Sequence, residues 1–153
     1  MEQNYSEDEK FIRMAISLAE KSAIKGNHPF GAVLVKDGKA LHEFENKVIT
    51  GQDVSYHPEF LAAQMAGKKY DPVFLKDCTL YASTEPCPMC SGAIYWSGIK
   101  RIVYGCSKET LGKYAGKGFG INIRDLFQNS HQPPEIIGPV LEDEAAKSHE
   151  NFW

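Results

Sequence analysis

Residues 79–90 have the sequence Thr79-Leu80-Tyr81-Ala82-Ser83-Thr84-Glu85-Pro86-Cys87-Pro88-Met89-Cys90. Residues 79–83 predict a strand, because they mix β-branched, aromatic and apolar side chains. Residues 86–90 predict the start of a helix that ends near Gly98. Upstream, His57-Pro58-Glu59 begins a second predicted helix that runs to Gly67, since proline is well tolerated in the first turn of a helix. Cysteines and a histidine therefore stand at two predicted helix starts.

Helices and strands alternate along the rest of the chain. Ser6-Glu7-Asp8-Glu9 has capping-box spacing and predicts a first helix that ends at Gly26. Asp37-Gly38 predicts a hairpin turn, and the dense glycines of 113–120 predict a mobile loop. Strands are expected at 31–36, 39–45, 79–83, 101–106 and 135–140, and a last helix at 141–152. This alternation predicts an α/β sandwich with one sheet between helical layers.

Composition favours one ordinary globular domain spanning residues 1–153. Apolar runs are shorter than the roughly 20 residues of a membrane span, and the acidic start differs from a signal peptide. We therefore expect a cytoplasmic protein with no membrane partner, in which the four cysteines stay reduced. The formal charge of −3 gives no electrostatic reason to expect a nucleic-acid partner.

His57, Cys87 and Cys90 form a predicted zinc-ligand set. One imidazole and two thiolates leave a fourth tetrahedral position open for water, as in catalytic zinc sites. A spacing of three residues in a first helical turn lets both sulfurs reach one ion, and the helix dipole favours their thiolate forms. Glu59 lies two residues after His57. It can shuttle protons during the attack of water on an amidine-like ring carbon.

Simpler interpretations stand beside this one. A lone Cys-x-x-Cys pair is also typical of redox proteins and structural zinc modules, but neither accounts for Glu59 after His57. Cys78 and Cys106 sit in or beside predicted strands and are expected to be core thiols. The remaining histidines lack metal-ligand spacing, so we expect surface or hydrogen-bonded roles for His28, His42, His131 and His149.

With this pattern, His-x-Glu followed by Pro-Cys-x-x-Cys, the chain resembles the cytidine deaminase superfamily. Nearly the whole chain takes part, including Pro29-Phe30-Gly31-Ala32-Val33 and Gly92-Ala93-Ile94-Tyr95-Trp96. The resemblance is to the branch of guanine, cytosine and tRNA adenosine deaminases. It implies a cytidine-deaminase-like mixed sheet of about five strands flanked by helices, a Zn²⁺ cofactor, hydrolytic release of ammonia and a homodimer.

The resemblance also suggests substrate contacts. Phe30 would stack on the base, Asn46 would hydrogen-bond the base or ribose, and Trp153 beside Phe152 would cover the site. Core packing is the alternative for Phe30 and the C-terminal aromatics, and a turn for Asn46. Glu85 and Trp96 belong to matching segments, and Trp96 has a core role as its alternative.

Departures from the family pattern bear on the substrate. Relatives usually have Ala or Gly where this chain has Pro58, which has no N–H to donate to a substrate acceptor. Gly118-Phe119-Gly120-Ile121 lacks the acidic pair typical of guanine deaminases, whereas 136–142 resembles tRNA adenosine deaminases without a basic tail. We expect a small purine base or nucleoside such as guanine or guanosine as substrate. Cytosine and adenosine in tRNA are the alternatives.

Overall fold

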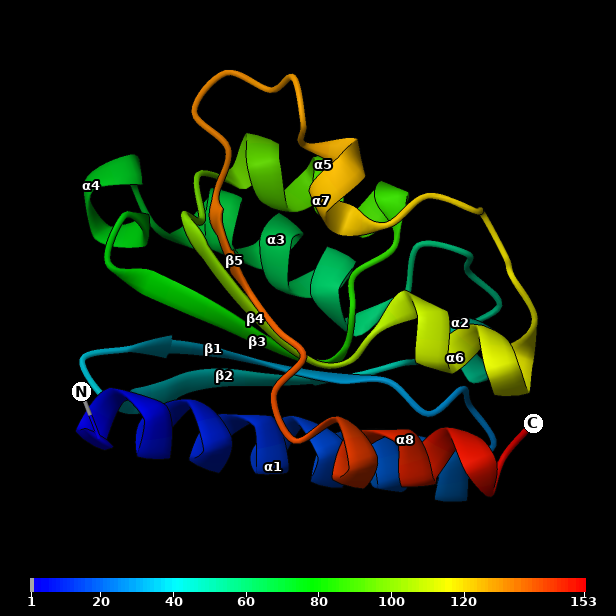
Figure 1. Cartoon of the computed structure of the whole chain (residues 1–153). Coiled ribbons are helices and arrows are strands. Elements are labelled where there is room, and N and C mark those ends of the chain that lie inside the picture. Colours follow the sequence, from blue (N-terminus) through cyan, green and yellow to red (C-terminus); the bar gives the residue numbers. More distant parts are fainter. Residues whose placement is uncertain (1) are drawn as a thin grey trace.

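A five-stranded mixed sheet lies between two helical layers in the computed structural model, which describes residues 2–153 and their side chains from residue 7 onward (Figure 1). The helices are α1 (Glu2–Ile24), α2 (Val48–Gly51), α3 (Pro58–Lys69), α4 (Pro72–Leu75), α5 (Pro88–Ser97), α6 (Lys108–Ala115), α7 (Ile123–Leu126) and α8 (Glu142–Glu150). The strands are β1 (Gly31–Lys36), β2 (Lys39–Glu45), β3 (Cys78–Thr84), β4 (Arg101–Cys106) and β5 (Glu135–Ile137). The predicted α/β sandwich is confirmed.

The sheet has the strand order β2-β1-β3-β4-β5. β1 pairs antiparallel with β2 and β3, while β3–β4 and β4–β5 are parallel. The β1–β2 hairpin turns at Asp37 (φ 52°) and Gly38 (φ 71°), the positive-φ pair that an Asp-Gly turn requires. Because β3 and β4 are parallel, α5 must carry the chain back between them, which places the start of α5 at the carboxyl end of β3.

Each face of the sheet has its own apolar core. α1 and α8 cover one face, and α3, α5 and α7 cover the other (Figure 1). The core under α1 and α8 includes Phe11, Ile12, Val33, Val103 and Ala145. The core under α3 and α5 includes Leu34, Ala62, Leu80, Ile94 and Ile102. Side chains alternate between these two cores along the strands, as the period of two of a strand requires.

Gly31 sets the close approach of α1 to β1. A Cβ atom at residue 31 would lie 2.4 Å from the Ala15 carbonyl oxygen and 2.6 Å from the Leu18 Cβ. Only glycine lets the helix sit this close to the strand, and this fixes the segment before β1 that carries His28 and Phe30.

Several predicted boundaries were wrong. α1 begins at Glu2 rather than at Ser6, whose side chain is outside the described residues. Residues 113–115 of the predicted loop belong to α6, which Ser107 caps by accepting from the Thr110 N–H. α3 continues past Gly67 to Lys69, and β5 stops at Ile137. No helix among the described residues is both long and apolar enough to cross a membrane.

Candidate metal centre

The predicted zinc ligands meet at two helix starts. His57 is the N-cap residue of α3, Cys87 is the N-cap residue of α5, and Cys90 lies in the first turn of α5. The His57 Nδ1 atom is 3.8 Å from Cys87 Sγ and 3.5 Å from Cys90 Sγ, and the three ligand atoms all lie within 4.8 Å of one another. Ligands bound tetrahedrally at about 2.0–2.3 Å lie about 3.5 Å apart, so this group has nearly the spacing that zinc needs.

The electrostatics of the group favour a thiolate. A hydrogen bond from the Cys90 thiol is the main cause that lowers the pKa of Cys87 to about 4, and the His57 ring and the Cys90 backbone N–H act in the same direction. The same bond and burial raise the pKa of Cys90. The bond to Cys87 raises the pKa of His57. Cysteines bind zinc as thiolates, so the lowered pKa of Cys87 favours metal binding here.

Glu59 is the buried carboxylate beside this group. Its side chain is 5% exposed, and its Oε1 atom is buried without a hydrogen-bond partner in the structure. Burial, together with the negative charge of Cys87, raises the pKa of Glu59 to about 7. A carboxylate with such a pKa can both accept and return a proton near neutral pH, as general acid–base catalysis requires.

The donor chemistry fits zinc. His57, Cys87 and Cys90 would hold Zn²⁺ with three protein ligands and leave one position open. When bound, zinc supplies a Lewis acid that lowers the pKa of water and polarises the reacting centre. The buried Oε1 of Glu59 has no hydrogen-bond partner and is available to accept a proton, and the role of Glu59 as proton shuttle stays a prediction.

The sequence and structure match known deaminases. Residues 5–106 match the family model of the cytidine and deoxycytidylate deaminase zinc-binding region. The chain belongs to this deaminase family. It is therefore a hydrolase that acts on C–N bonds, with a zinc-binding site.

Relatives of this deaminase differ in their substrates. A probable cytosine deaminase of Schizosaccharomyces pombe is 40% identical over 152 residues, which are 95% of this chain and 92% of the relative. A tRNA-specific adenosine deaminase of Haemophilus influenzae is 35% identical over 147 residues, which are 95% of this chain and 83% of the relative. The X-ray structure of guanine deaminase from Bacillus subtilis is 36% identical with a TM-score of 0.63, over 82% of this chain and 77% of that one.

Asn46 and Phe30 lie beside each other at the β1–β2 end. The Asn46 backbone N–H donates to the Phe30 carbonyl at 3.1 Å, and the Asn46 Oδ1 accepts from the Val48 N–H at 3.0 Å. The Asn46 side chain is buried, yet its Nδ2 has no partner within the structure. A buried donor without an acceptor is costly, so this amide is available for a ligand acceptor.

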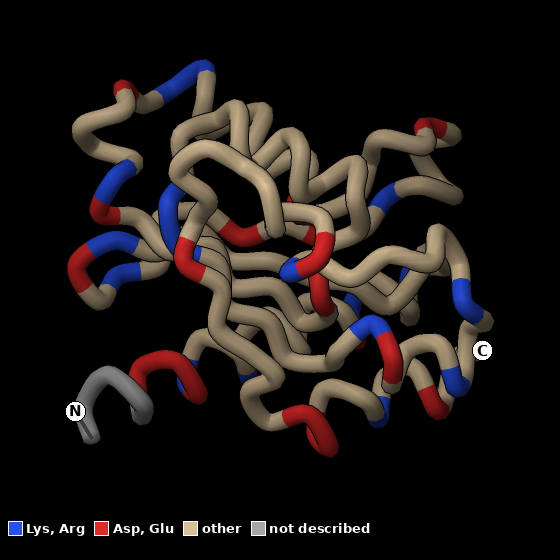
Figure 2. Tube along the Cα trace, turned by 45° about the horizontal axis from the view of Figure 1, so that its top comes forward, with Lys and Arg blue, Asp and Glu red and all other residues tan. Residues whose placement is uncertain are grey.

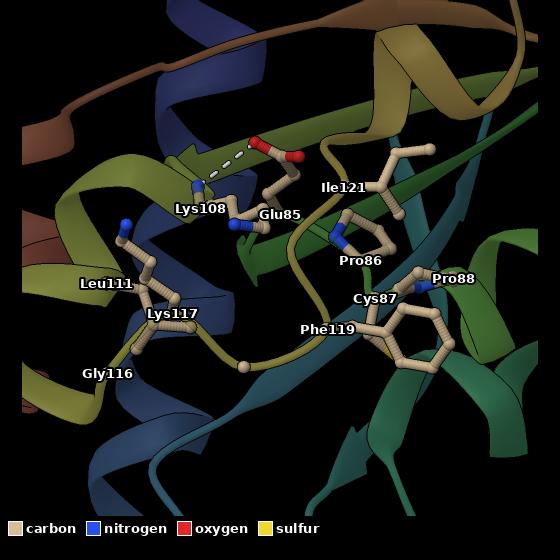
Figure 3. A pocket seen from close by; sticks show the side chains of 11 residues that line it. Glu85, Pro86, Cys87, Pro88, Lys108, Leu111, Gly116, Lys117, Phe119 and Ile121 are labelled. Carbon is tan, nitrogen blue, oxygen red and sulfur yellow. Dashed lines mark hydrogen bonds between the residues drawn. The ribbon is translucent and has the colours of Figure 1, made fainter.

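Glu85 braces the loops next to the ligands. Its Oε1 accepts from the Lys108 N–H at 3.0 Å and its Oε2 from the Ile123 N–H at 2.7 Å, so it holds the starts of α6 and α7. Figure 3 shows Glu85 between Pro86 and α6, with the bond to Lys108 drawn. The carboxylate already accepts two backbone hydrogen bonds, and its contact with substrate stays a prediction.

Phe119 is a residue whose position the sequence did not indicate. Its ring lies beside Cys87 and Pro88 in the pocket of Figure 3, on the loop between α6 and α7. Phe119 is strongly exposed, and the glycines on both sides have positive φ angles of 55° (Gly118) and 88° (Gly120). Glycine on either side of an aromatic residue was the available signal, because such a segment can place a large ring with little steric restraint.

Trp96 does not line the pocket that contains Cys87. It is 83% exposed at the carboxyl end of α5, packs edge-on against Tyr95 at 5.0 Å and borders a shallow hollow with Leu126 and Phe127. Core packing is therefore excluded, and its contact with substrate stays a prediction. Pro58, in contrast, is buried at the first position of α3, between His57 and Glu59.

An aromatic cluster forms where the C-terminus meets the segment before β1. Trp153 stacks on His28 at 5.4 Å, while Phe152 and Phe30 contact the same imidazole edge-on at 6.0 and 6.5 Å. Burial lowers the pKa of His28, and the charge of His57 acts in the same direction. His28 is thus half-buried rather than a surface residue, because the C-terminal rings pack onto it.

Proposed function

We propose that this deaminase removes an exocyclic amino group from a small purine base or nucleoside of the guanine or guanosine type. The single domain over residues 1–153 would do so with water, releasing ammonia. The observation that carries the proposal is the buried, unpaired Glu59 Oε1 beside the His57, Cys87 and Cys90 group. It is the arrangement that hydrolytic loss of an amine needs, a proton acceptor next to a Lewis-acid site.

Substrate binding would use the two sides of the site. Asn46 Nδ2 would donate to an acceptor on the base or ribose, since it is a buried donor with no partner in the structure. Phe30, Phe119 and Trp153 would offer ring faces to a flat heterocycle. The purine preference is supported by the likeness to a guanine deaminase structure at 36% identity. A cytosine substrate is the nearest alternative, since the S. pombe relative bears that name.

The experiment is an ammonia-release screen on protein whose zinc content has been measured. Guanine, guanosine, adenosine, cytosine and aminated pterins and triazines would be compared at equal concentration. We expect the highest kcat/KM with a purine, and loss of activity after chelation with return on adding Zn²⁺. Absence of zinc from protein purified without chelator, or turnover of pyrimidines alone, would contradict the proposal.

Adenosine in tRNA is a second candidate because the H. influenzae relative covers 95% of this chain. Electrostatics disfavour it: the formal charge is −3, and Figure 2 shows acidic and basic residues interspersed around the trace. A gel shift with tRNA at low and physiological salt discriminates, because binding through phosphates weakens steeply as salt rises. We expect no shift at physiological salt.

A small-molecule substrate is consistent with a cytoplasmic location. The cysteines are all free thiols in the structure, Cys78, Cys87, Cys90 and Cys106, as a reducing compartment would keep them. The predicted core positions of Cys78 and Cys106 are confirmed, since both are buried.

A further inference from the structure

His149 is a fully buried histidine that the proposed chemistry does not use. It lies on the last turn of α8 and is 0% exposed. Both ring nitrogens have a partner: Trp153 Nε1 lies 3.0 Å from His149 Nδ1, and Thr84 Oγ1 lies 2.7 Å from His149 Nε2. A buried imidazole with two defined partners has a fixed orientation, so it can fix the orientation of what it binds.

The chemistry of the partners sets the tautomer. An indole N–H can only donate, so His149 Nδ1 must be the acceptor and the ring proton must sit on Nε2. The Nε2–H then donates to Thr84 Oγ1 at the end of β3, three residues before the metal ligand Cys87. This chain of bonds ties the C-terminal residue of the sequence to the strand that leads into the metal centre.

The same contacts place the Trp153 ring. The indole, whose N–H bonds His149, stacks on His28 with an interplanar angle of 28°. Phe30 packs against the His149 ring, with the ring centroids 5.2 Å apart. Trp153 is still 46% exposed, so packing alone does not hold it. The Trp153 backbone N–H also donates to the His149 carbonyl at 3.2 Å, so the bond from the indole N–H to Nδ1 is the side-chain contact that orients the ring on the aromatic cluster.

We propose that His149 is a positioning residue that holds Trp153 against His28 at the entrance of the same chain's zinc site, where the indole forms one side of the substrate pocket. The inference rests on the proposed function for its kinetic consequence only. The contact itself is testable without turnover. The ligand class is a flat aromatic heterocycle, because the side that it meets is an indole face next to an imidazole and a phenyl ring.

The first test reads the tautomer and the location. A long-range ¹H–¹⁵N NMR spectrum of the zinc-loaded protein should show that the His149 ring is protonated at Nε2 and unprotonated at Nδ1. Replacing Zn²⁺ by Co²⁺ should quench the part of the tryptophan emission that Trp153→Phe removes, because Co²⁺ quenches over short distances. Protonation at Nδ1, or Trp153 emission that is unaffected by Co²⁺, would overturn the proposal even if the protein turns over no substrate.

The second test separates positioning from a merely structural role. His149→Leu, which keeps bulk without an acceptor, and Trp153→Phe, which keeps a ring without a donor, should each raise KM about tenfold with kcat within about twofold. That ratio corresponds to one lost hydrogen bond of about 1.4 kcal/mol. The double variant should be no worse than either single one. His149→Asn, whose Oδ1 can replace Nδ1 as acceptor, should stay within about threefold of the parent.

The control is His131→Leu, a histidine in an exposed loop. It should leave KM and kcat unchanged. Additive effects of His149→Leu and Trp153→Phe, or an unchanged KM in folded His149→Leu protein, would overturn the proposal. If His149→Leu does not fold, Trp153→Phe and the spectrum of the unmodified protein decide. A correct tautomer and quenching without ammonia release from any substrate would refute the proposed function and leave the contact standing.

Discussion

A single carboxylate without a partner distinguishes this metal centre from a structural zinc site. Glu59 is buried, its Oε1 meets no donor, and burial raises its pKa to about 7. We expect Glu59→Gln to keep the zinc content of the parent and to lower kcat at least about 100-fold, because an amide cannot shuttle a proton. Metal analysis and ammonia release measure the two effects. Glu43→Gln on β2 is the control, and retained activity in Glu59→Gln would refute the role.

Pro58 bears on which ring the site accepts. It lacks the N–H that Ala or Gly would present at the buried first position of α3. We expect Pro58→Ala to change the ranking of the substrates by kcat/KM, with shifts of about fivefold between them, since one hydrogen bond contributes on the order of 1 kcal/mol. A kinetic comparison over the substrate panel measures this. Pro72→Ala, which replaces the proline at the start of α4, is the matched control, and an unchanged ranking would contradict the hypothesis.

His149 should make the stability of the fold depend on pH. Burial lowers its pKa to about 4 from the usual 6.5, so the unfolded chain binds a proton that the folded protein refuses. The contribution is therefore complete above pH 6.5, declines as pH falls from 6.5 towards 4, and amounts to on the order of 3 kcal/mol. Urea unfolding between pH 4 and 7 should show a shallower decline in His149→Asn than in the parent. Equal slopes would contradict the prediction.

At the scale of elements, one residue joins three of them. Glu85 accepts from the first turns of α6 and α7 while its own N–H donates to the Cys106 carbonyl of β4 at 2.8 Å. We expect Glu85→Ala to lower the free energy of unfolding by about 3 kcal/mol, because two N–H groups lose a charged acceptor. Glu109→Ala, at an exposed position of α6, should cost less than about 1 kcal/mol. Urea denaturation measures both, and equal losses would contradict the assignment.

Elements defined by local pattern could be predicted from the sequence. The Asp-Gly hairpin, the two helix starts that carry His57 and Cys87, and the Gly98 end of α5 depend on neighbouring residues alone. The short helices α2, α4 and α7 have only four residues each, too few to produce a hydrophobic period, and were not predicted.

Contacts between segments that are distant in the chain could not be predicted from the sequence. Thr84 and His149 are 65 positions apart, and their hydrogen bond exists because α8 docks beside α1 on the sheet. No periodicity records such a pairing, and so His149 and His28 had no site role in the sequence analysis. The same holds for the unpaired Nδ2 of Asn46, which depends on how Val48 folds back to bond the Oδ1.

At the scale of the whole molecule, large apolar side chains are exposed on the α5–α7 face. Trp96 is strongly exposed there, and Met89 is exposed on the same helix. The hollow that Trp96 borders is lined by Tyr95, Leu126 and Phe127. Apolar side chains gathered on one surface are typical of an interaction site. The family resemblance implies a homodimer, and we expect a second copy of the chain to cover this face.

The mass in solution tests this inference. Light scattering should give about twice the 17.1 kDa of one chain, and Trp96→Glu should shift the protein to one chain's mass, because a charge buried in the interface has no partner. Ile24→Glu is the matched control, since Ile24 is an equally exposed apolar residue at the end of α1 on the opposite helical layer, and it should leave the dimer intact. A monomeric parent protein, or a dimer that Trp96→Glu does not weaken, would exclude the α5–α7 face as the subunit interface. The exposure of Trp96 would then need another explanation.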